Sequence, residues 1–253
     1  MRRLPVVALT LLIGAAACDE ETSNATEPQF AKSEAATGKA GEALYRVTMY
    51  NLTSGQPFTP PVAAIHRQSI GLFDVGQPAS FEVKEIAENG NLAPLIELAS
   101  TNRQVIDAAV TPGPGAPDVP PVMPGQMVTF DLEGRTGAKY LSIVAMLICT
   151  NDGFTGANTL RLPKQVGSME TVDAYGYDAG TEVNTESWVD LVPPCGPLTG
   201  FDSMGQGTGM SDPDLFEDGT VQMHPGIMGD SDLDAEVHGW DGPVARITVE
   251  RIG

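Results

Sequence analysis

The chain has 253 residues and carries 33 acidic against 14 basic side chains, which gives a formal net charge of −19 at neutral pH. This charge argues against nucleic acid as a partner, because proteins bind a phosphate backbone with clustered lysines and arginines. It fits a soluble acidic surface, cation binding or an extracellular, salt-adapted protein.

Residues 1–17 have the three parts of a secretory signal, which are a charged start, an apolar run and a group of small residues. The apolar run is about ten residues long and falls short of the ~20 that a membrane-spanning helix needs. Cys18 follows directly and resembles the acylated cysteine of a bacterial lipobox, although Ala15 stands where leucine is usual. The alternative is an ordinary signal peptide cut near Ala17. We therefore expect an exported protein that is either lipid-anchored in the cell envelope through Cys18 or secreted.

Residues 18–41 are polar and small and show no hydrophobic periodicity. Such a segment cannot bury enough apolar surface to offset the entropy lost on ordering, so we expect a flexible tether. The remaining residues, 42–253, are enough for one β domain with its own core. A lipid on Cys18 would hold this domain on a membrane without spanning it, and we expect no other membrane contact.

Strand signals dominate this domain. Side chains alternate between apolar and polar, or form a short apolar run, at residues 44–52, 127–132, 140–148 and 243–252. The run at 140–148 is apolar enough to be buried on both faces. Stretches 108–125 and 200–234 are rich in turn residues and predict loops. Short strands between such turns predict an all-β fold, an antiparallel β-sandwich with long loops.

Helix signals are few and confined to one region. Residues 79–83 are compatible with a short strand, whereas residues 81–88 followed by Gly90 are compatible with a helix that ends at a glycine C-cap. Residues 91–98 are compatible with a second helical turn. We therefore expect one or two short helices beside the sheets.

Beyond Cys18, the chain contains two cysteines, Cys149 and Cys195. An even pair in an exported domain favours a disulfide over a metal site or a nucleophile, because exported proteins fold in an oxidising environment. Two separate buried thiols are the alternative. A bridge would tie the segment that contains Asp152 to the one that follows Glu182.

Two acidic turns concentrate the chemistry of the chain. Asp178 and Glu182 flank a turn that contains Gly180, and Asp152 follows the buried strand predicted at 140–148. Calcium prefers roughly six to eight oxygen ligands from flexible loops. Three converging carboxylates would repel one another unless a cation neutralised them. The turns therefore predict a Ca²⁺ site, although acid pairs at this spacing also arise by chance in so acidic a chain.

Other candidate side chains fit known sites less well. The rival acids lack the glycine and terminal glutamate of an EF-hand and are predicted to be solvated; they are Asp202, Asp212, Asp214 and the run 230–234. The histidines share no metal-binding spacing; they are His66, His224 and His238. No Gly-x-Ser-x-Gly nucleophile elbow occurs in the sequence.

Several stretches together resemble bacterial members of the spondin-domain family. The opening stretch is YRVTMYNLTSGQPFTP at residues 45–60, and His66, Phe73, Gly76 and 87–90 follow it. The later stretches are 150–156, 177–186, 221–227 and 243–247. Each stretch is weak alone, whereas the combination is specific and covers residues 45–252.

The resemblance implies a fold, a metal site and a class of function. Animal members of the family, F-spondin and mindin, are extracellular matrix proteins with a C2-like antiparallel sandwich that carries a calcium ion. Carried over by motif, the calcium ligands are Asp152, Asp178 and Glu182. Glu182 stands where the animal proteins have Asp, which lengthens this ligand's arm.

Signal and resemblance together predict a surface-anchored binding or adhesion module, stabilised by Ca²⁺, that is not an enzyme. Its ligand is expected to be an extracellular glycan or protein, since the resemblance names no particular partner. One alternative is a secreted metal-dependent hydrolase that uses the same carboxylates, with His224 or His66 as general base. Another is a structural envelope protein without a specific ligand.

Overall fold

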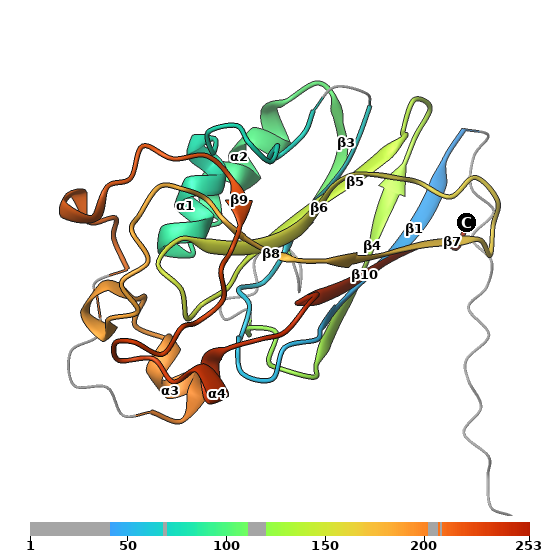
Figure 1. The fold of residues 1–253 in the computed structure, drawn as a ribbon. Coiled ribbons are helices and arrows are strands. Elements are labelled where there is room, and N and C mark those ends of the chain that lie inside the picture. The colour runs from blue at the N-terminus through green and yellow to red at the C-terminus, as the bar shows by residue number, and fades with distance from the viewer. Residues whose placement is uncertain (1–40, 68–69, 111–119, 202–206, 208) are drawn as a thin grey trace, which may run out of the picture. The chain divides into compact units, whose positions relative to one another are not determined.

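The structure is a computed structural model that describes residues 41–67, 70–110, 120–201, 207 and 209–253. The predicted signal peptide, Cys18 and all of the tether before Gly41 lie outside the described residues. Within them the chain forms two antiparallel β-sheets with few and short helices (Figure 1). The predicted all-β antiparallel sandwich is therefore confirmed. No helix in this described part is long and apolar enough to cross a membrane.

The two sheets differ in size. The smaller sheet contains four strands in the order β4 (Met127–Gly134), β1 (Ala43–Asn51), β10 (Ala245–Arg251) and β7 (Met169–Ala174). The larger sheet contains six strands in the order β3 (Val105–Val110), β2 (Val62–His66), β5 (Tyr140–Met146), β6 (Gly153–Arg161), β8 (Gly176–Asp178) and β9 (Gln222–Met223). β7 and β8 follow each other in the chain, so the chain passes from one sheet to the other there.

The smaller sheet follows its sequence alternation. In β1, Val47 and Met49 are fully buried, while Thr48 lies on the other face and pairs with Thr248 of β10. Side chains of this inner face meet those of β2 and β5 to form the first core, which lies between the sheets. On the outer face, Arg46 forms an ion pair with Asp131 at 2.9 Å. Apolar residues at every second position thus fix which face of β1 points inward.

A second core covers the other face of the larger sheet. Helices α1 (Phe81–Asn89) and α2 (Ala93–Thr101) lie over this face (Figure 1), and their buried side chains share the second core with Val144 and Met146 of β5. Because β5 also contributes Ile143 to the first core, the strand is buried on both faces, as its apolar run predicts.

Helix α1 settles the ambiguity at residues 79–88 in favour of a helix. The Ser80 side chain accepts a hydrogen bond from the Val83 N–H and caps the N-terminus. Gly90 has a left-handed backbone with φ of 62°, and its N–H bonds to the last carbonyls of the helix. The second helix is α2, which was expected at 91–98.

The remaining elements are short. They are α3 (Cys195–Thr199), α4 (Ala235–His238) and the 3₁₀ turns Trp188–Asp190 and Pro213–Leu215. The stretch predicted as a loop at 200–234 is mostly irregular where it is described, and Asp202 lies outside the described residues. Of the loop predicted at 108–125, residues 111–119 also lie outside them, and its first residues extend β3.

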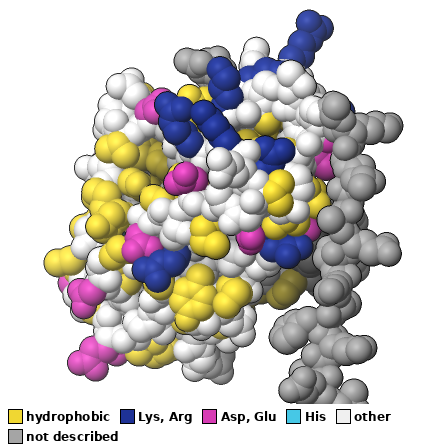
Figure 2. All heavy atoms as spheres, turned by 90° about the vertical axis from the view of Figure 1, so that its right-hand side faces the viewer, with side chains coloured by type: hydrophobic (Ala, Val, Ile, Leu, Met, Phe, Trp, Pro, Cys, Tyr) yellow, Lys and Arg dark blue, Asp and Glu magenta, His cyan; other side chains and the backbone are white. Residues whose placement is uncertain are grey.

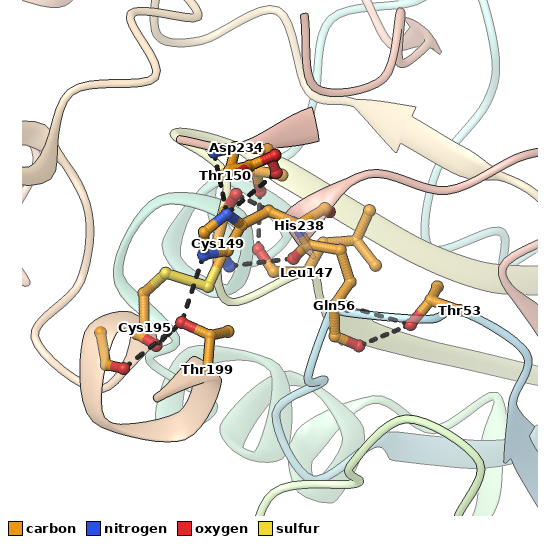
Figure 3. Close-up of a disulfide and its surroundings, with 10 residues drawn as sticks. Thr53, Gln56, Leu147, Cys149, Thr150, Cys195, Thr199, Asp234 and His238 are labelled. Carbon is orange, nitrogen blue, oxygen red and sulfur yellow. Dashed lines mark hydrogen bonds between the residues drawn. A yellow bond between two sulfur atoms is a disulfide. The ribbon is translucent and has the colours of Figure 1, made fainter. Parts of the chain in front are cut away.

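A disulfide joins Cys149, which follows β5, to Cys195 at the start of α3 across a sequence separation of 46 residues (Figure 3). The predicted pairing is confirmed, and both cysteines are buried. The buried Gln56 side chain holds the Cys149 backbone from the other side. Its Oε1 accepts from the Cys149 N–H at 3.1 Å, and its Nε2 donates to the carbonyls of Cys149 and His238 (Figure 3).

Replacing both cysteines, Cys149→Ala with Cys195→Ala, should lower the free energy of unfolding by about 2–4 kcal/mol, because the unfolded chain regains the entropy of an open loop. For a domain of this size the melting temperature should fall by about 10 °C. Calorimetry with and without dithiothreitol measures the effect. Reductant should lower the wild-type melting temperature and leave that of the double variant unchanged; equal wild-type curves would contradict the stabilising role.

Candidate metal centre

Asp152 sits in the tight turn that joins β5 to β6. The Thr150 hydroxyl donates to the Leu147 carbonyl at 2.6 Å and accepts from the Gly153 N–H at 2.9 Å, which closes the turn. A Cβ on Gly153 would lie 2.3 Å from the Thr150 Oγ1, so only glycine fits there. The turn leaves the Asp152 side chain fully buried.

Strand pairing brings Asp178 to the same place. Asp178 ends β8 and is the direct partner of Gly153 across the β6–β8 pair. The Ala179 N–H donates to the Asp152 carbonyl at 3.1 Å, which continues the pairing into the turn. The two acidic turns therefore lie side by side.

The Asp152 carboxylate binds the turn that carries Glu182. Its Oδ2 accepts from the Thr181 N–H at 2.7 Å, the Thr181 hydroxyl at 3.2 Å and the Glu182 N–H at 3.0 Å. Its Oδ1 is buried and has no hydrogen-bond partner among the described residues. A buried carboxylate oxygen without a partner is costly, and a cation is a ligand that would satisfy it.

The other two acids are also engaged by backbone or amide groups. Asp178 accepts from the Gly180 N–H and from the Asn184 side chain, both at 2.7 Å. Glu182 accepts from the Asp212 N–H at 2.8 Å. All three carboxylates are buried, so each is held by polar partners instead of water.

The electrostatics of the site disfavour three free charges. Burial, helped by the charge of Asp178, raises the pKa of Asp152 to about 6. Burial also raises the pKa of Glu182 to about 7, helped by the charges of Glu88 and Asp152. A bound cation would oppose both causes, because it replaces lost hydration and attracts the carboxylates. The residues present therefore fit a hard cation such as Ca²⁺.

The structure does not draw the three acids into a closed ligand shell. Among the described residues, the one group of three metal-binding side chains with atoms within 4.8 Å of one another is Cys149, Cys195 and His238. Its two sulfurs form the disulfide, so this group is not a metal site. Asp152, Asp178 and Glu182 surround one turn without meeting at that distance.

Three further polar residues of this region were missed from the sequence. Glu88 of α1 is buried, is paired with Lys84 at 3.0 Å and has an Oε1 without a partner among the described residues. Asn184 holds Asp178, as described above. Glu186 has a left-handed φ of 53°, and its carboxylate accepts from the N–H groups of Met228 and Gly229. Glu88 could have been noticed in the sequence, because it follows Lys84 by four residues, a spacing that allows an ion pair on a helix. The sequence carries no such signal for Asn184 or Glu186.

The rival acids and the histidines have other positions. The exposed acids among them include Asp212, Asp214 and Asp234, and the first and last cap short helical turns. His66 pairs with Tyr140, at the opposite end of β5 from Asp152. His224 is buried, and its Nδ1 accepts from the Gly226 N–H. The Nε2 of His224 has no hydrogen-bond partner among the described residues, and burial lowers the pKa of this histidine to about 4, while the nearby charge of Asp178 opposes the shift.

The fold and the site together define a disulfide-linked antiparallel β-sandwich with a polar cluster in the loops at one end. The family model described as Spondin_N matches residues 49–188. The chain belongs to this family of spondin domains, which are extracellular adhesion or binding modules. No curated protein matches the chain.

Replacing Gly180 by Ala should disrupt the turn between Asp178 and Glu182. Gly180 has a φ of 68°, and an added Cβ would lie 2.6 Å from the Thr220 nitrogen, so strain and a backbone clash add together. We expect a loss of about 2–4 kcal/mol in the free energy of unfolding.

The matched control for this variant is Gly242→Ala. Gly242 has a φ of 70° but open space where the Cβ would lie, so it should lose only about 1 kcal/mol from backbone strain. Urea unfolding of both variants separates the two effects. Equal losses would show that the contact with Thr220 does not constrain the turn.

Proposed function

We propose that this protein is an exported, surface-anchored binding or adhesion module whose loop end is stabilised by calcium. Membership of the spondin family supports the binding role. The observation that supports the metal is the buried Asp152 Oδ1, which lacks a partner among the described residues, in a site where the pKa values of both Asp152 and Glu182 are raised. The signal sequence and Cys18 support export and a lipid anchor.

Asp152, Asp178 and Glu182 would hold the ion, and a bound Ca²⁺ would neutralise their charges. The hydrogen bonds that these carboxylates accept determine which loops the ion would stabilise. Asp152 holds the 181–182 backbone, and Glu182 holds the Asp212 N–H. Three loops distant in sequence therefore depend on these carboxylates staying ionised and in place. We assign the metal an architectural role and no role in catalysis.

The surface beside the site is suited to a ligand. Glu182 lines an open pocket of about 290 Å³ together with Glu88 and Phe216. Phe216 is 64% exposed, and Val183, whose N–H bonds to Leu215, is 48% exposed next to it. Exposed apolar side chains beside carboxylates suit a glycan or a matrix protein, because a sugar ring or an apolar anchor packs on an aromatic face.

Calcium should raise the melting temperature of the wild-type protein by roughly 5–10 °C at about a hundred times its dissociation constant, because it binds the folded state only. Calorimetry with calcium and then with chelator measures the shift. Asp152→Asn should abolish it, since the variant lacks the charged oxygen at the centre of the site.

Asp230→Asn serves as the control for this experiment. Asp230 is an exposed acid in the loop that follows β9, so its variant loses the same charge without touching the site. It should keep the full calcium shift. A wild-type protein without any calcium shift would refute the metal site.

The ligand class is tested on an array of glycans and matrix proteins, probed with and without chelator. Phe216→Ser should weaken binding of the protein to its ligand on the array. Chelator should weaken this binding to the extent that calcium orders the loops beside Phe216. Absence of any bound spot for the wild-type protein would favour a structural envelope role over a binding role.

The lipid anchor is tested in cells that export the protein. The wild-type chain should partition into the detergent phase, and Cys18→Ala should move it to the aqueous phase, because each buried CH₂ of an acyl chain adds about 0.8 kcal/mol of membrane affinity. Mass spectrometry of the N-terminal peptide identifies the acyl groups. An unmodified peptide that begins at Cys18 would support ordinary secretion instead.

A further inference from the structure

The few cations of this acidic domain are concentrated at one end of the sandwich. The basic end, as we call it, comprises seven of the ten Lys and Arg residues in 41–253, namely Arg67, Arg103, Arg135, Lys139, Arg161, Lys164 and Arg251. Figure 2 faces this end and shows Lys and Arg side chains gathered in its upper part. The acidic turns lie at the opposite end of β5, beyond Met146.

Hydrogen bonds connect the loops that carry four of these cations. The Arg67 guanidinium donates to the Arg103 carbonyl at 2.8 Å. The Lys139 N–H donates to the His66 carbonyl at 3.1 Å, so the loop between β4 and β5 lies beside Arg67. That loop also contains Arg135. Four cations from three separate loops are therefore neighbours.

The other half continues from the same loop. The Leu162 N–H donates to the Lys139 carbonyl at 3.0 Å, which places the β6–β7 loop alongside. Arg161 lies over the Tyr140 ring at 5.8 Å, and the Arg251 guanidinium donates to the Lys164 carbonyl at 2.6 Å. The loops that carry the seven cations are thus linked to one another.

The basic end is available for a partner. Six of its seven cations are exposed, and Arg251 is half-buried. Among the described residues, only Arg135 forms an ion pair, with the exposed Glu133 at 3.3 Å, and such a surface pair contributes little. The same end carries exposed apolar side chains, since Val166 and Met169 beside Lys164 are 65% and 59% exposed.

The start of β1 adds a geometric argument. β1 begins at Ala43, which pairs with Gly134, and Gly134 precedes Arg135. The segment before β1 therefore joins the domain at the basic end.

We propose that the basic end docks on an anionic lipid surface and turns the acidic loop end away from it. Cations next to exposed apolar side chains match the boundary between charged headgroups and acyl chains. The acidic end does not prevent docking, because seven residues of β5 separate the ends by about 23 Å, and salt screens charges beyond ~8 Å. This inference goes beyond the proposed function and needs neither calcium nor the ligand.

The test uses the mature chain, residues 18–253, with Cys18→Ala, so that neither the apolar signal nor an acyl chain contributes, in the presence of chelator, so that calcium cannot bridge to lipid. Co-sedimentation is measured with phosphatidylcholine vesicles with and without phosphatidylglycerol. Binding should require phosphatidylglycerol and weaken with salt. The double variant Arg135→Gln with Lys164→Gln should bind roughly twenty- to thirtyfold more weakly, at about fivefold per cation.

The matched control is Arg46→Gln with Arg246→Gln, which removes two exposed cations from the outer face of the smaller sheet. It should bind as the wild type does. Val166→Ser should weaken vesicle binding but not retention by dextran sulfate. Equal loss in both double variants, or wild-type retention by dextran sulfate without vesicle binding, would overturn the proposal in favour of general charge attraction or a soluble polyanion.

Discussion

The organisation of the loop end depends on one buried carboxylate. Asp152 has no exposed surface, and its Oδ2 alone accepts three hydrogen bonds from Thr181 and Glu182. A buried acid is tolerated only when its oxygens are satisfied, and here one oxygen is saturated while the other lacks a partner among the described residues. The same side chain therefore fixes the adjacent turn and leaves a binding position for a cation. The turn and the proposed metal site both depend on this residue, because the same carboxylate accepts the hydrogen bonds of the turn and would bind the cation.

A disulfide and several hydrogen bonds fix the position of the segment that contains Asp152. Three residues before it, Cys149 is tied to α3 by the disulfide and to Gln56 by two hydrogen bonds. Gln56 also holds the His238 carbonyl at the end of α4. Short helical turns such as α3 and α4 have few internal bonds, so they depend on these links for their position. The result is an end of the sandwich whose long loops are ordered by cross-links instead of by regular structure.

The sequence predicted the parts of the fold that have one buried face and a clear period. β1 and β10 alternate over their whole length, and the apolar run of β5 matches a strand covered on both sides. Among the strands that the sequence did not predict, β2 and β6 have clear physical reasons: β2 is fully buried, short and preceded by prolines, and β6 starts with Gly-Phe-Thr-Gly and contains Thr159 at a φ of 56°. These segments form strands because they pair with β5, which lies between them in the larger sheet. The disulfide was predictable from cysteine number, whereas Glu186 was not, since its carboxylate bonds to backbone groups some forty residues away.

The arrangement of loops at the two ends of the sandwich also explains how an acidic protein can have one basic end and one acidic end. Antiparallel strands place their connecting loops alternately at either end, so charges that are scattered in sequence become sorted in space. Arg67, Lys139 and Lys164 follow or precede strands at one end, whereas Asp152, Asp178 and Glu182 do so at the other. Because the strands are longer than the distance over which salt screens charge, each end acts as a separate electrostatic surface. The net charge of the chain therefore conceals a basic surface, and composition alone is a poor guide to the partners of a β-sandwich whose charges are carried by its loops.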